Sequence, residues 1–249
     1  GNNRHGTLQD NAVIDTTPAS NHVGNGKLDL DGTNDYVQLP SVSGIQSISM
    51  WVNIDPSESP AAGWAYLLDA RTGLGSGWFA NKSIGSNWTR LVVDGSSVPV
   101  AWNNIPRDGG WHHVYAESNV TFTDDINLAS RVSDNEALDI QMDEVALWNR
   151  TFTDGEIAAM SSSPVDTGET GLLAYYPFAD GPGSTVLTDA SGNGNDGTLV
   201  NMDVGTAWIF RSSSRTRSPR RRTSQAAVEP VPRPTRTGWP WPGNSVRRA

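Results

Sequence analysis

The sequence contains no cysteine, so disulfide bonds and thiolate metal sites cannot stabilise its fold. It also has no run of about 18 apolar residues, so we expect no membrane-spanning helix. Its first residues, Gly1–His5, do not form a signal peptide. Long helical patterns are few, whereas 25 glycines, 15 prolines and 10 tryptophans among 249 residues favour many short strands joined by tight turns.

The net charge of -9 is distributed unevenly along the chain. From Phe210 onward there are ten arginines and one glutamate, about +9, whereas residues 1–209 carry 8 basic and 26 acidic side chains, about -18. This acidic body argues against nucleic acid as a partner and suits calcium or a neutral glycan. The Arg/Pro-rich tail, residues 210–249, has almost no aliphatic side chains, so we expect it to be disordered.

One stretch, Ile140–Arg150, carries the most information about the fold. It is an apolar run that contains an acidic pair, and a polar turn and a short helical segment, Gly155–Met160, follow it. Val145 and Leu147 share one parity of an extended strand, which predicts a strand with one buried face. Asp143 has the same parity, so we do not expect it to be an ordinary solvated side chain.

Further strands are predicted before this stretch. Lys27–Pro40 contains two strands around an Asp-Gly turn. In Ser47–Ile54 apolar residues occupy alternate positions, which predicts an apolar inner face with Trp51 on the outer face. Gly109–Val114 predicts another strand, whose adjacent histidines, His112 and His113, face opposite sides and cannot share a metal ion.

The sequence also contains an internal repeat. Gly1–Leu8 aligns with Gly192–Leu199, but only the later copy is preceded by the apolar segment Leu172–Phe178. We therefore expect the first copy to lack the apolar strand that precedes the later one. Because a missing strand leaves an unpaired edge, we expect Leu172–Phe178 to fold back into the vacant place, or to do so in a strand-exchanged neighbour.

These motifs resemble the laminin-G-like domain of the concanavalin A-like lectin/glucanase superfamily over roughly residues 1–209. The resemblance implies an all-β fold, a two-sheet antiparallel jelly-roll sandwich. In these terms, residues 1–162 form a jelly roll that lacks its opening strand. Residues 163–209 supply a linker and the opening strand and loop of a second copy, which can complete the first domain, and residues 210–249 form the disordered tail.

The resemblance also implies a structural calcium ion. Family members often hold it between the opening loop and an acid of the closing strand, here Asp143. The loop, Asp189–Gly197, has the oxygen-rich, turn-prone composition that calcium requires. Its candidate ligands are Asp189, Asn193, Asn195 and Asp196. In the alternative interpretation, the loop is only a Gly/Asn turn and Asp143 an ordinary hydrogen-bonded residue.

A glycoside hydrolase is the sharper alternative. Asp139, Gln141 and Asp143 alternate along the closing strand, as the carboxylates of jelly-roll glucanases do. The middle residue is an amide, however, and Glu136 and Glu144 have the wrong parity for the enzyme motif. We therefore expect no enzymatic activity.

Exposed aromatic rings commonly stack on sugars, and Trp51, Trp88 and Trp102 are the ligand-binding candidates, although Trp64 and Trp78 are also available. Core packing accounts for most tryptophans of a sandwich. The resemblance implies a non-catalytic carbohydrate-binding or adhesion module of a larger extracellular or cell-surface repeat protein, with a glycan or cell-surface polysaccharide as partner. The alternative is a purely structural spacer repeat with no ligand beyond calcium.

Overall fold

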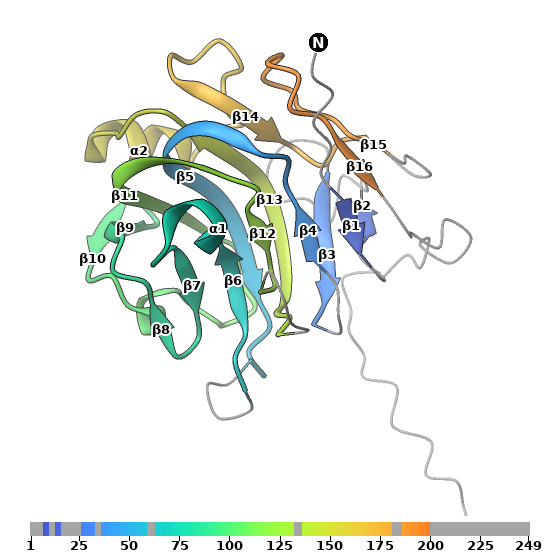
Figure 1. Ribbon diagram of the computed structural model, residues 1–249. Coiled ribbons are helices and arrows are strands. Elements are labelled where there is room, and N and C mark those ends of the chain that lie inside the picture. Colours follow the sequence, from blue (N-terminus) through green and yellow to red (C-terminus); the bar gives the residue numbers. More distant parts are fainter. Residues whose placement is uncertain are drawn as a thin grey trace, which may run out of the picture. The chain divides into compact units, whose positions relative to one another are not determined.

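The computed structural model describes residues 7–9, 13–15, 26–32, 36–58, 63–131, 136–180 and 186–199. For residues 7–9, 13–15, 31, 186 and 197–199 it describes the backbone alone. The predicted disordered tail, residues 210–249, and the first six residues lie outside these ranges. Two mainly antiparallel sheets pack as a sandwich around one main core, which confirms the predicted all-β class (Figure 1).

Within the described residues, the first sheet has the strand order β15-β16-β1-β4-β12-β6-β7-β8. Its strands are Thr7–Gln9 (β1), Tyr36–Gln38 (β4), Tyr66–Asp69 (β6), Trp78–Ala80 (β7), Ser83–Ile84 (β8), Asn127–Leu128 (β12), Val186–Leu187 (β15) and Gly197–Leu199 (β16). β1 and β16 pair in parallel, with Thr7 opposite Thr198. Equivalent residues of the two repeat copies therefore lie side by side.

The second sheet contains the long strands, in the order β10-β9-β11-β5-β13-β3-β2, with β14 beside β13. Its strands are Val13–Asp15 (β2), Lys27–Asp31 (β3), Val42–Ile54 (β5), Trp88–Val93 (β9), Ser96–Val98 (β10), His112–Asp124 (β11), Asp139–Trp148 (β13) and Leu172–Tyr176 (β14). Figure 1 shows β11, β5 and β13 as a curved layer. In the described ranges the helical elements are Arg71–Leu74 (α1), Trp102–Asn104 (a 3-10 turn) and Asp154–Met160 (α2), and none of these is long and apolar enough to cross a membrane.

The core lies between the two sheets and follows the predicted alternation on β5. Its side chains from β5 include Ile48, Met50, Val52 and Ile54. They meet residues of the opposite sheet such as Val37, Leu68 and Phe79, all of them buried. Trp51 belongs to the other face of β5, as the sequence predicted.

The two strands predicted in Lys27–Pro40 are present, but they belong to different sheets. β3 pairs with β2 and β13, whereas β4 pairs with β1 and β12. The turn between them, which includes Gly32 at φ 75°, therefore carries the chain from one sheet to the other. Local turn chemistry alone does not distinguish this crossing from a hairpin.

The segment Leu172–Tyr176 returns to the closing strand within the same chain. β14 pairs with the second half of β13, with Tyr176 opposite Val145 and Ala174 opposite Leu147. β3 pairs with the first half of β13, so the two short strands share one side of it. This is the fold-back that the repeat predicted. The division of the chain into parts of two copies stays a prediction.

Helix α2 covers part of the outer face of the second sheet. Thr153 caps it and forms a capping box with Glu156, because a hydroxyl and a carboxylate at this spacing satisfy the first N–H groups of a helix. A second apolar cluster lies beneath the helix; its buried members are Val92, Tyr115, Ala146, Trp148, Phe152, Ile157, Leu172 and Tyr175. The predicted helical segment is confirmed.

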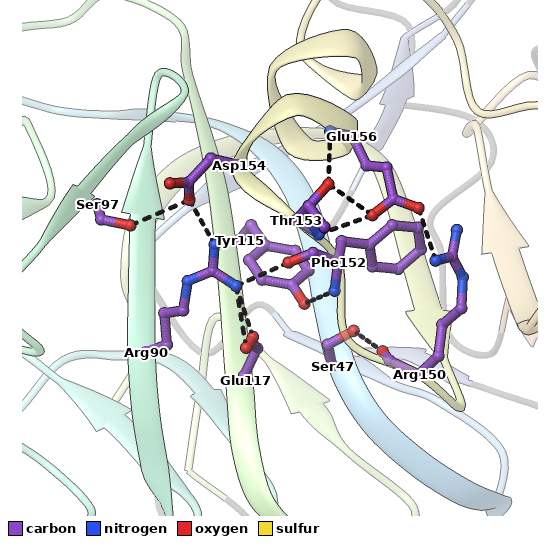
Figure 2. A network of polar contacts seen from close by, with 10 residues as sticks. All are labelled: Ser47, Arg90, Ser97, Tyr115, Glu117, Arg150, Phe152, Thr153, Asp154 and Glu156. Carbon is purple, nitrogen blue, oxygen red and sulfur yellow. Dashed lines mark hydrogen bonds and ion pairs between the residues drawn. The ribbon is translucent and has the colours of Figure 1, made fainter.

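A polar network fixes this helix to the sheet (Figure 2). Arg90 on β9 donates to Glu117, to the carbonyl oxygen of Phe152 and to Asp154. On the other side of Phe152, Arg150 forms an ion pair with Glu156 at 2.8 Å. Hydrogen bonds from the Thr153 backbone and from Arg150 lower the pKa of Glu156 to about 2. The network anchors the helix to the sheet.

Candidate functional site

The loop predicted to bind calcium is organised by its own hydrogen bonds. The carboxylate of Asp189, which is 5% exposed, accepts hydrogen bonds from the backbone N–H groups of Tyr175, Ser191 and Asn195 at 2.9 to 3.0 Å. Asp196 accepts one from the N–H of Asp189. The loop thus holds its shape as a network of carboxylate-capped turns.

The two asparagines of this loop attach it to β14. The side-chain amide of Asn193 donates to the carbonyl oxygens of Leu172 and Leu173, and that of Asn195 donates to Leu173 at 2.8 Å. The carbonyl oxygen of Asn195 accepts from the Tyr176 hydroxyl at 3.0 Å. Both asparagines therefore contribute to strand placement through their amide nitrogen atoms.

Asp143 lies on the outer face of β13, because a β-bulge changes the parity of the strand. The register shifts between Asp143 and Ala146, and Glu144 takes a left-handed conformation with φ 53°. Met142 and Val145 both enter the core, while Asp143 lies opposite Trp51. The predicted shared parity of Asp143 and Val145 is therefore wrong, although Asp143 is fully buried, at 0% exposed.

The predicted calcium ligands do not form one carboxylate cluster. Among the described residues, no group of three or more His, Cys, Asp or Glu side chains could hold a metal ion, and this set includes Asp143, Asp189 and Asp196. Calcium also takes amide and backbone carbonyl oxygen atoms as ligands. A calcium ion held between the loop, through Asp189, Asn193, Asn195 and Asp196, and Asp143 stays a prediction of the resemblance.

The three tryptophans chosen as sugar-stacking candidates are all buried. Trp51 is 8% exposed, Trp88 is 3% exposed and Trp102 is 4% exposed. Trp88 and Trp102 belong to the main core, and the ring of Trp51 contacts His113 edge-on, with 5.3 Å between centroids. A sugar needs an accessible ring face, so these rings do not offer a stacking surface.

The histidine pair has the predicted opposite orientations. His113 is buried, at 3% exposed. The His112 ring lies between Asp94, at 2.7 Å, and Asp108, at 3.1 Å. Burial would lower the pKa of His112, but its hydrogen bonds to the two carboxylates raise it. The pair serves two separate structural contacts.

An aromatic surface occurs instead at the β6–β7–β8 end of the first sheet. Its exposed member is Trp64, at 39%, which stacks on Tyr66 with 5.9 Å between ring centroids and 30° between planes. Tyr66 and Trp78 do not belong to the main core, whereas their neighbours Ala65 and Phe79 do. We call Trp64, Tyr66, Trp78, Arg71 and Lys82 the Trp64 platform.

Cations connect the rings of the Trp64 platform. The guanidinium of Arg71 lies 5.4 Å from the Tyr66 ring centroid and 5.8 Å from that of Trp78, while two hydrogen bonds hold it on the buried carboxylate of Asp69. The hydrogen bond to Asp69 raises the pKa of Arg71. At the other end, the Lys82 ammonium lies 5.6 Å from the Trp64 ring centroid. The side chains thus form a continuous row.

Sequence reasoning gave Trp64 no priority, although a signal was present. Trp64 and Tyr66 are two residues apart, and on an extended chain they share the face opposite Ala65 and Leu67. On the neighbouring strand, Trp78 precedes the core residue Phe79 and therefore takes the opposite face, and it pairs with Asp69. Period-two analysis of this weakly patterned segment therefore would have put aromatic rings on one outer face.

Comparisons with known proteins give no assignment. No protein-family profile, no curated protein and no solved structure matches this chain. What the observations establish is an all-β sandwich of two sheets, compatible with a jelly roll. Function has to be argued from the surface itself.

Proposed function

We propose that this chain is a non-catalytic carbohydrate-binding or adhesion module of a larger extracellular, laminin-G-like repeat protein. The observation that carries the proposal is the Trp64 platform, in which the exposed Trp64 ring stacks on the buried ring of Tyr66, itself 4% exposed. Trp64 and Val120 are the two large apolar side chains that are exposed in the described part of the chain. Tryptophan is enriched at interaction sites, because its ring is apolar and its indole N–H is polar.

The platform suits a sugar because its rings are already in place. Tyr66 supports Trp64 from one side, Arg71 joins Tyr66 to Trp78, and Ser83 accepts a hydrogen bond from the Trp78 indole at 2.9 Å. A rigid ring loses little side-chain entropy when a ligand binds, so more of the contact energy remains as affinity. Sugar C–H groups would lie on the ring, and polar edges would receive the hydroxyl groups.

Two features of the earlier hypothesis have no part in this binding step. The glycosidase alternative needs two accessible carboxylates, but Asp143 is fully buried and Gln141 separates it from Asp139. A structural calcium ion in the Asp189–Gly197 loop remains a proposal from the resemblance, and the Trp64 platform shares no residue with that loop. The competing function is a purely structural spacer, which would have no glycan ligand.

A glycan array that compares the wild type with Trp64→Ala tests the proposal. Loss of one stacked ring is expected to weaken binding by about 1.5 kcal/mol, roughly tenfold. Val120→Ala is the matched control, because it removes the other exposed apolar side chain, which is 48% exposed on β11. If the wild type binds no glycan, the result favours the structural spacer. If Trp64→Ala binds glycans as tightly as the wild type, the Trp64 platform is not the binding site.

A further inference from the structure

Among the charged groups around the Trp64 platform that the structure describes, four form two ion pairs and Lys82 belongs to neither. Arg71 pairs with Asp69 at 2.5 Å, and Arg131 pairs with Glu136 at 3.4 Å. Arg131 and Glu136 also act electrostatically on Tyr66, so both lie near the platform. Within the part of the chain that the structure describes, Lys82 forms no ion pair. Counted over the described residues, the platform therefore has one cation without a paired carboxylate, in a body of about -18.

Lys82 is also placed where a ligand would bind. It is exposed, in the turn between β7 and β8, and its ammonium lies over the Trp64 ring. A cation on an exposed ring face is held weakly, by a few-fold in the equilibrium constant. A neutral sugar would have to displace this ammonium and would gain nothing from it. A carboxylate beside the stacked sugar would keep the ammonium as its counter-ion.

We infer that the Trp64 platform selects a glycan in which one sugar carries a carboxylate, a uronic acid, and that Lys82 determines this preference. The inference rests on the proposed glycan-binding function. One excess cation matches one ligand charge. A polyanion such as a sulfated polysaccharide needs several cations and would be repelled by the acidic body.

The experiment uses an array of matched oligosaccharide pairs that differ in one position, a uronic acid against the parent neutral sugar. The proteins are the wild type, Lys82→Gln, Trp64→Ala and Arg107→Gln. Arg107 is the matched control, because its guanidinium also lies over a tryptophan ring, 5.9 Å from the centroid of Trp102, but that ring is buried.

The wild type should bind the uronic acid member about tenfold more tightly than the neutral one. The ion pair with Lys82 and the cation–π contact that Lys82 keeps with Trp64 each contribute a few-fold to this preference. Lys82→Gln should remove this preference while it keeps or improves binding of the neutral member, whose ring face is now open. High salt should weaken only the uronic acid complex. Arg107→Gln should behave like the wild type.

Three results would overturn the inference and leave the proposed function standing: equal binding of both members by the wild type, a preference that survives Lys82→Gln, or stronger Lys82-dependent binding of a sulfated polysaccharide. In each of them binding would still depend on Trp64. If Trp64→Ala bound like the wild type, or if no sugar bound at all, the proposed function would fail together with the inference.

Discussion

Glu144 is a buried carboxylate in an unusual backbone conformation. It is 3% exposed, and one oxygen atom accepts hydrogen bonds from the Tyr175 hydroxyl at 2.5 Å and from the N–H of Val165 at 2.9 Å. The other oxygen, Oε1, has no hydrogen-bond partner among the described residues. Burial raises the pKa of Glu144, and the two hydrogen bonds only partly oppose this effect. A buried carboxylate of this kind costs stability while it is charged.

Glu144→Gln should therefore reduce the pH dependence of stability. The folded-state pKa lies above the unfolded one, so the folded protein takes up the proton first and gains stability as the pH falls through the folded pKa. In thermal unfolding, the stability of the wild type should therefore rise relative to that of Glu144→Gln as the pH falls towards the ordinary glutamate pKa of 4.5. Glu169→Gln, which alters a partly exposed carboxylate, is the control for net charge. Parallel pH curves would contradict the prediction.

Asp189→Ala should destabilise the protein whether or not calcium binds. The substitution leaves three backbone N–H groups without their acceptor, and the expected loss in unfolding free energy is about 2 kcal/mol or more. Asp166→Ala, which removes an acceptor for one exposed N–H group, is the control. Denaturant unfolding measures both, and equal losses would contradict this role of Asp189.

The same unfolding assay tests the calcium proposal. An ion that binds only the folded state adds RT ln(1 + [L]/Kd), about 2.7 kcal/mol at a hundredfold excess over Kd. If chelator does not change the unfolding midpoint, the loop does not hold a stabilising calcium ion.

At the scale of elements, the sequence identified β13 as the closing strand but not its irregularity. The apolar run, the helical segment after it and the alternation on β5 are local patterns, and each is confirmed. The bulge at Glu144 depends on two neighbouring strands, because β3 pairs with β13 up to Met142 and β14 pairs from Val145 onward. Because this change of pairing partner involves strands far apart in the sequence, the local alternation of apolar residues in β13 does not reveal the bulge.

Gly26 lies where β14 and β3 come closest. It precedes β3, and an added methyl group there would overlap the carbonyl oxygen of Phe178, which follows β14 and has φ 48°. Gly26→Ala should therefore lower the unfolding free energy by at least about 2 kcal/mol, since backbone atoms must move apart.

The matched control for Gly26→Ala is Gly155→Ala. An added methyl group at Gly155, in helix α2, meets nothing within 4 Å. This change should stabilise the protein by about 0.5–1 kcal/mol, because alanine favours the helix more than glycine does. Chemical denaturation of both variants checks the opposite signs, and a neutral Gly26→Ala would show that the two strands do not abut.

At the scale of the whole molecule, the sandwich could be predicted from motifs, but the functional surface could not be chosen from them. The sequence contains ten tryptophans, and their local patterns do not say which of them is exposed. Trp88 and Trp102 are buried because the second sheet and the 3-10 turn pack them inward, and Trp64 is exposed because it precedes a strand near a sheet edge. Exposure is a property of the assembled sheets, so the choice needed the structure.

The structural role of the two repeat copies is likewise evident only in the assembled molecule. β16 of the later copy lies beside β1 of the first copy, and β14 supplies Ala174 and Tyr176 to the main core. Phe178 and Leu187 join them there, all at 0% exposed. The segment after the linker is therefore an integral part of the sandwich.

A chain that ends at residue 163 should accordingly fail to fold, and a peptide of residues 172–199 should restore folding when it is added separately. Replacing a buried aromatic ring with alanine costs about 3–5 kcal/mol, so the loss of Tyr176 and Phe178 alone approaches the total stability of about 5–15 kcal/mol for an ordinary domain. The peptide would also return the pairing partner of β13 and thereby cover its exposed edge. Circular dichroism and two-dimensional NMR of the shortened chain, with and without the peptide, measure this. A shortened chain with native spectra and an unchanged melting temperature would show that the first domain is complete without the later copy.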